Sequence, residues 1–119
     1  MAVSKLILSL ANQCVEARNR VSVDIIKTPL LKSKLELSEK TQVSYKSENF
    51  QITGSFKVRG ALSKLSKLPT FSPVITASSG NHGIACSYAA KTTGHKLTVV
   101  LPEKESRAKK SKIESKGTK

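Results

Sequence analysis

The sequence predicts an α/β fold built on a parallel strand–helix–strand unit. Two short, uninterrupted apolar runs, Val74–Ala77 and Leu97–Leu101, are rich in β-branched residues, which is typical of strands buried on both faces. Between them a helix is predicted from about Asn81 to Gly94, where a glycine is placed to end it. Strands joined by a helical crossover of this length pair in parallel, so the predicted sheet is parallel.

The segments before this unit predict a helix, an extended connection and a strand. Apolar residues recur at helical spacing between Leu6 and Val15, which predicts an amphipathic helix that needs another surface to cover it. Pro29 interrupts the stretch 21–31 and favours an extended connection, because proline fixes φ and lacks an N–H. The segment Val43–Phe50 is predicted to form a strand with alternating faces.

Two further helices are predicted, one before and one after the strand–helix–strand unit in the sequence. Ser55 is placed to cap the first, which runs to Leu68 and carries Lys57 in its first turn. The second is a polar, lysine-rich helix that begins near Glu103 and ends at Gly117. It has few apolar residues to bury, so its own packing stabilises it little.

The charge of the chain is strongly positive. Lys and Arg number 21 against 8 Asp and Glu, a formal net charge of +13. Such an excess attracts nucleic acid, anionic membranes or phosphate-bearing ligands. With three Phe, two Tyr and no Trp, the chain lacks the interleaved aromatic residues of most nucleic-acid modules, so a nucleic-acid partner is not expected.

The cysteines and histidines are informative about metal binding, and the lengths of the apolar runs about the cellular location of the protein. Cys14 and Cys86 lie on apolar helix faces without ligand spacing, so both are predicted to be buried free thiols. His82 and His95 lie at opposite ends of one helix, so no metal site is expected. No apolar run reaches the roughly 18–20 residues needed to cross a bilayer. A cytoplasmic protein without membrane contact is expected.

Two motifs carry chemistry. Lys57 lies within Thr53–Ala61, where flanking glycines let a ligand approach, and it is the candidate Schiff-base lysine. The segment Ser78-Ser79-Gly80-Asn81-His82-Gly83 follows a strand and opens a helix, where unpaired backbone N–H groups can hold an anion. Taken alone, Lys57 would be one solvated lysine among many, and the surrounding motif is what favours the functional interpretation.

With Thr28-Pro29-Leu30 and Lys46-Ser47-Glu48-Asn49-Phe50-Gln51, these motifs resemble the pyridoxal-phosphate enzymes of the tryptophan synthase β fold (fold type II). Within that family they resemble the threonine/serine dehydratase and serine racemase branch. The resemblance implies pyridoxal 5'-phosphate as cofactor and homo-oligomeric full-length relatives. It also implies an N-terminal fragment: residues 1–54 would begin the large domain, and residues 55–119 would form most of the small parallel-sheet domain. The glycine-rich loop that cradles the cofactor phosphate is not among these residues.

The resemblance also implies roles for the motif residues. Lys57 would bind the cofactor and act as base, with Phe56 beside the cofactor and Asn81 donating to its phenolic oxygen. The substrate carboxylate would lie on the turn formed by Ser78, Ser79, Gly80, Asn81 and His82. Ser79 would either hold that carboxylate or exchange a proton on the opposite cofactor face. Arg59 could equally be a surface or a structural charge, and neither it nor Phe56 is assigned a catalytic role.

Three functions follow as hypotheses. The first is β-elimination of L-threonine or L-serine to 2-oxobutanoate or pyruvate and ammonia, with this chain a weakly active or inactive piece. The second is serine racemisation, which needs a second base opposite Lys57. The third is a non-catalytic basic remnant that binds anionic partners.

Overall fold

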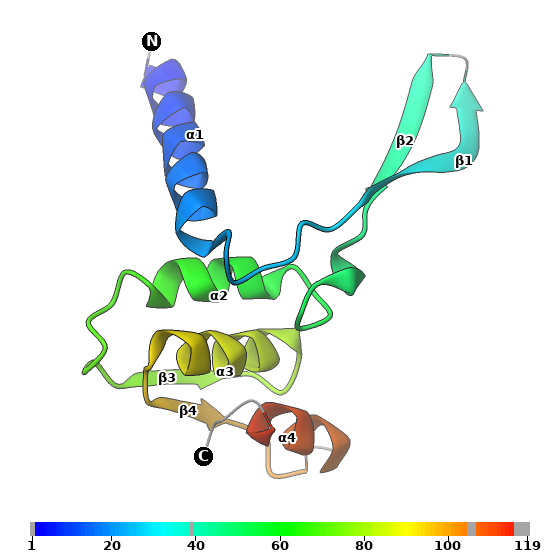
Figure 1. Cartoon of the computed structure of the whole chain (residues 1–119). Helices are drawn as coiled ribbons and strands as arrows, with labels where there is room; N and C mark the ends of the chain where they lie inside the picture. The colour runs from blue at the N-terminus through cyan, green and yellow to red at the C-terminus, as the bar shows by residue number, and fades with distance from the viewer. Residues whose placement is uncertain (1, 39, 105–106, 116–119) are drawn as a thin grey trace.

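The computed structural model describes residues 2–38, 40–104 and 107–115 (Figure 1). A long N-terminal helix and a hairpin extend from a layered body made of two helices and a two-stranded sheet. In chain order the elements are α1 Ala2–Val21, β1 Leu30–Ser38, β2 Thr41–Lys46, a 3-10 helix Glu48–Phe50, α2 Lys57–Leu65, β3 Val74–Ala77, α3 Asn81–Thr93, β4 Leu97–Val100 and α4 Arg107–Glu114.

The predicted strand–helix–strand unit is confirmed. β3 and β4 pair in parallel, in a register that places Val74 opposite Leu97 and Ala77 opposite Val100, and α3 connects them. Gly94 ends α3 with a φ of 76°, and its N–H donates to the carbonyl of Ala90. Glycine adopts this left-handed conformation without the steric cost that a Cβ would add. The α/β class therefore follows directly from the pattern of this segment.

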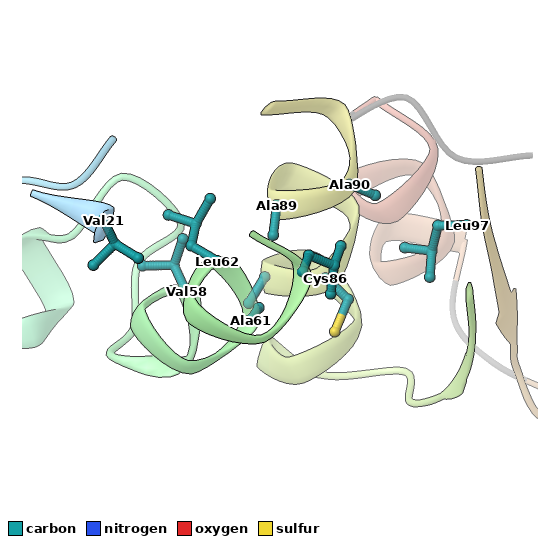
Figure 2. Close-up of a cluster of buried hydrophobic side chains, with 10 residues drawn as sticks. Val21, Val58, Ala61, Leu62, Cys86, Ala89, Ala90 and Leu97 are labelled. Carbon is teal, nitrogen blue, oxygen red and sulfur yellow. The ribbon is translucent and has the colours of Figure 1, made fainter. Parts of the chain in front are cut away.

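The core lies between α2, α3 and the sheet. α3 is made largely of small residues and is buried on more than one side, with Ala85 and Ala89 fully covered. Figure 2 shows Ala61 and Leu62 of α2 on one side of α3 and Leu97 of β4 on the other. Small side chains let neighbouring backbones approach closely, so α3 forms the middle layer of the body.

The sheet is covered on one face only, which corrects the prediction that both faces are buried. Among the described helices, α3 is the one that contacts β3 and β4. Val74 and Val99 pack toward the core, while the side chain of Ile75 is 71% exposed and that of Val100 is 50% exposed. The uninterrupted apolar run does form a strand, but its second face has no covering element in the described residues.

The N-terminal half contains a hairpin that the sequence pattern did not reveal. β1 pairs antiparallel with β2, with Leu31 opposite Tyr45 and Ser38 opposite Thr41. The predicted strand 43–50 is instead β2 at 41–46, followed by the 3-10 helix. Leu31 and Leu35 are exposed, so cross-strand hydrogen bonding rather than burial holds this hairpin. A prediction based on hydrophobic burial misses such a strand.

Helix α2 begins two residues after Ser55, so the predicted Ser55 cap is wrong. Phe56 occupies the N-cap position and already has helical φ and ψ angles of −62° and −15°. Ser55 therefore lies in the turn before the helix. Its Oγ is buried there and has no hydrogen-bond partner among the described residues. α2 also ends at Leu65, three residues earlier than predicted. Lys57 is confirmed in the first turn of this helix.

The two terminal helices differ from the expectations in their burial. α1 is longer than the segment Leu6–Val15 on which its prediction was based, and it packs on α2. Cys14 is exposed, so its predicted burial is wrong. The burial of Cys86 is confirmed. The predicted polar helix forms as α4, whose Ile113 is buried against α3, while Gly117 lies outside the described residues. Across the described residues, no helix combines the length and apolarity needed to cross a membrane.

Candidate functional site

The start of α2, the turn before α3 and the carboxyl ends of β3 and β4 lie at the same end of the layered body (Figure 1). α2 and α3 pack together through the core, which fixes the relative placement of their first turns. In open parallel sheets, ligands bind at the carboxyl ends of the strands. A hollow of about 400 Å³ lies there, lined by Ala77, Ser78, Ser79, Val100, Leu101 and Pro102.

Lys57 is the first residue of α2 and its side chain is exposed. Its Nζ lies 5.0 Å from the centroid of the Phe56 ring, within the range of a cation–π contact. The loop before it turns at Gly54, whose φ of 75° suits glycine. The Lys57 amine is therefore accessible to a ligand at the N-terminus of a helix.

The turn before α3 leaves its backbone donors open. Gly80 is the N-cap, and it offers no side chain to the first N–H groups of the helix. Ser78 fixes the turn from both sides: its N–H donates to the carbonyl of Val100 at 3.2 Å, and its Oγ accepts from the N–H of Gly80 at 3.3 Å. Asn81 and His82 are exposed beside these donors. Such a turn suits a carboxylate or phosphate oxygen.

Gly83 is required for the close approach of this turn to the helix. A Cβ at this position would lie 2.3 Å from the carbonyl oxygen of Ser78 and 3.3 Å from Cδ1 of Ile113. Gly80, in contrast, has nothing within 4 Å of such a Cβ. The second glycine of the motif therefore permits packing, while the first leaves the approach to the turn open.

His82 and Cys86 face one another one helical turn apart. The Nε2 of His82 lies 3.5 Å from the Sγ of Cys86, and burial raises the pKa of the Cys86 thiol. His95 lies at the other end of α3, where it contacts Thr93 and the Pro69 carbonyl. The described residues contain no group of three or more His, Cys, Asp and Glu side chains that could hold a metal.

The sequence analysis missed an ion pair beside the Lys57 helix. The guanidinium of Arg59 donates to both carboxylate oxygens of Glu48, from Nη2 at 2.7 Å and from Nε at 2.8 Å, and the hydroxyl of Thr28 donates at 2.6 Å. The Arg59 hydrogen bond lowers the pKa of Glu48 to about 2, with help from Thr28. Arg59 therefore has the structural role. Glu48 and Thr28 both lie in sequence motifs described above, and this was the signal that could have pointed to the ion pair.

Fold and site together define a class of protein. Residues 21–119 match the family model described as pyridoxal-phosphate dependent enzyme, and the chain belongs to this family. Members of this family use pyridoxal phosphate.

Three relatives place the chain more closely. It is 40% identical over 110 residues to the L-threonine dehydratase catabolic TdcB of Staphylococcus aureus (strain bovine RF122 / ET3-1), covering 87% of this chain and 32% of that protein. The crystal structure of serine racemase from Dictyostelium discoideum matches at a TM-score of 0.82 and 38% identity, over 90% of this chain and 36% of that one. The crystal structure of a T.th. threonine deaminase matches at a TM-score of 0.78 and 37% identity, over 91% and 35%. The chain thus falls in the threonine dehydratase and serine racemase branch and spans about a third of the length of these relatives.

Proposed function

We propose that the chain carries the cofactor-attachment part of an enzyme that eliminates the β-hydroxyl of L-threonine or L-serine, giving 2-oxobutanoate or pyruvate and ammonia. The observation that supports this most directly is the common edge shared by Lys57 and the turn Ser78–His82. At one edge, an amine nucleophile can bind the cofactor while an anion-binding turn holds the carboxylate of the amino-acid substrate. We assign residues 1–54 to the beginning of the large domain and residues 55–119 to most of the small domain.

The residues at this edge fit pyridoxal phosphate. Lys57, Phe56 and Asn81 are all exposed. Lys57 would bind the cofactor covalently, Phe56 would lie beside it, and the Asn81 amide would donate to its phenolic oxygen. When bound, the cofactor withdraws electrons from the substrate α-carbon. Lys57 would move the α-proton, and the turn Ser78–His82 would orient the substrate carboxylate. The glycine-rich phosphate loop of the family is not among residues 1–119.

Serine racemisation is the second candidate, favoured by the similarity to the Dictyostelium discoideum serine racemase. It requires a proton donor on the face opposite Lys57. Ser79 is the candidate, because it is half-buried in the hollow at the carboxyl ends of the strands. Incubation with L-serine separates the two reactions: pyruvate would support elimination, and D-serine would support racemisation.

Selective attachment of the cofactor to Lys57 is the expected result that tests this proposal. The chain is mixed with pyridoxal phosphate and reduced with borohydride, and the pyridoxyl adducts are located by peptide mass. We expect one dominant adduct at Lys57, lost in Lys57→Ala, because this amine combines a helix N-terminus with an adjacent anion-binding turn.

Lys64→Ala is the matched control, since Lys64 lies in the last turn of the same helix. It should leave the Lys57 adduct unchanged. Labelling spread evenly over the lysines would contradict the proposal, and it would favour the third hypothesis, a basic chain that binds anions without a site.

A further inference from the structure

We propose that Glu48 and Arg59 are positioning residues for Lys57, which hold the start of α2 by closing the loop 48–59 with a bidentate ion pair. This inference rests on the proposed attachment of pyridoxal phosphate to Lys57. Glu48 opens the 3-10 helix and Arg59 is the third residue of α2, so the pair joins the two ends of the loop that carries the lysine.

The second half of this loop has other anchors only at some positions: the Gly54 N–H donates to the Gln51 carbonyl at 2.7 Å, and Ser55 and Val58 are buried. The remaining residues are held less tightly. Ile52 and Phe56 are exposed, and Gly54 takes a left-handed conformation. The hydroxyl of Thr53 donates to the Ser55 carbonyl, but this hydrogen bond is long, at 3.4 Å, and joins only near neighbours. A closure between Glu48 and Arg59 removes conformational freedom from every residue in the loop, including Lys57.

The ion pair is itself anchored to a third segment. Thr28 donates to the same Glu48 carboxylate, and Lys46 Nζ donates to the Thr28 carbonyl. The side-chain amide of Gln51 donates to the Ile26 carbonyl and accepts from the Ile26 N–H, each at 2.8 Å. The segment 26–28 therefore serves as a fixed support, to which both Glu48 and the beginning of the loop are tied.

The environment distinguishes this pair from an ordinary surface ion pair, which contributes little. The Glu48 side chain is 16% exposed and that of Arg59 34%. Both carboxylate oxygens accept hydrogen bonds, in the bidentate geometry that gives the strongest pairing. The Arg59 hydrogen bond lowers the pKa of Glu48 to about 2, so this carboxylate stays charged at acidic pH where an ordinary glutamate is protonated. The ion pair also neutralises a cation two residues from Lys57, which would otherwise compete for an anionic cofactor.

The test measures the ratio of pyridoxyl adduct at Lys57 to adduct at Lys64 in the whole chain, together with thermal unfolding followed by circular dichroism. Four variants are compared with the original chain: Glu48→Gln, Glu48→Arg, Arg59→Glu and the double exchange of Glu48→Arg with Arg59→Glu. We expect each single change to lower the ratio by about tenfold, because a charged hydrogen-bonded pair is lost. The double exchange re-forms the pair with reversed polarity but places a cation beside Thr28 and Lys46, so it should restore the ratio in part, to above that of either charge reversal alone.

Arg20→Gln is the matched control. Arg20 also ties another element to α2, through Ser63, but at a distance from the Lys57 end of the helix. It should alter the unfolding temperature and leave the labelling ratio unchanged. Glu48→Gln keeps the shape of the side chain and tests the role of the charge if the charge-reversed variants fold poorly.

The outcomes separate the two proposals. Preferential labelling of Lys57 in every variant would overturn the positioning role and leave the proposed function standing. A double exchange that recovers the unfolding temperature but not the ratio would also overturn it, because the pair would then serve folding alone. No preference for Lys57 in the original chain would overturn the proposed function and this inference with it.

Discussion

Gly83→Ala is expected to destabilise the fold by roughly 1–3 kcal/mol and to displace the turn before α3. The added Cβ would lie 2.3 Å from the Ser78 carbonyl oxygen, which is backbone and cannot rotate away. Alanine gains about 1 kcal/mol in helix propensity over glycine, but this gain is smaller than the cost of moving a turn held by Ser78 and Gly80. Thermal and urea unfolding followed by circular dichroism measure the change.

Gly60→Ala is the matched control for this substitution. Gly60 also lies within a helix, has no positive φ, and would place its Cβ in open space. It should stabilise the protein by up to about 1 kcal/mol, because only the propensity and unfolded-state effects remain. If both glycine variants stabilised the chain equally, the close approach of Ser78 to α3 would be refuted.

Leu62→Ala is the second large expected effect, a loss of about 2–4 kcal/mol in the free energy of unfolding. Leu62 is 1% exposed and lies in the core cluster between α2 and α3, as Figure 2 shows. Half of the ten buried residues of this cluster are Ala or Cys, and their short side chains cannot extend into the space. Against a typical stability of roughly 5–15 kcal/mol, this loss should lower the unfolding temperature clearly.

Leu8→Ala provides the comparison, since Leu8 is an exposed leucine of α1. Its substitution should change the free energy of unfolding by no more than about 0.5 kcal/mol. An equal loss from both leucine variants would contradict the assignment of the core to the α2–α3–sheet body.

The strand–helix–strand unit and the place of Lys57 could be predicted because local signals determine them. β-branched runs mark β3 and β4, and Gly94 marks the end of α3. The motif around Lys57 places it at a helix start, and α2 begins at that residue. These features depend on residues that are close together in the sequence, so a single amino-acid sequence is sufficient to predict them.

The remaining features depend on contacts between distant residues. The hairpin needs the cross-strand register of Leu31 with Tyr45, and the ion pair joins Glu48 to Arg59 and Thr28 through folding of the loop. Cys14 shares the apolar spacing of α1 but is exposed, because the stripe is not covered among the described residues. Periodicity indicates which face is apolar, while burial depends on what packs against it.

The most direct test of a shared cofactor edge is a two-dimensional amide spectrum of the ¹⁵N-labelled chain before and after pyridoxylation of Lys57. We predict that the amide resonances of Val58 and of Gly80, Asn81 and His82 shift together, because one ligand would contact the start of α2 and the turn before α3. Shifts confined to the neighbours of Lys57, with the resonances of the turn unchanged in a fully labelled chain, would contradict the account.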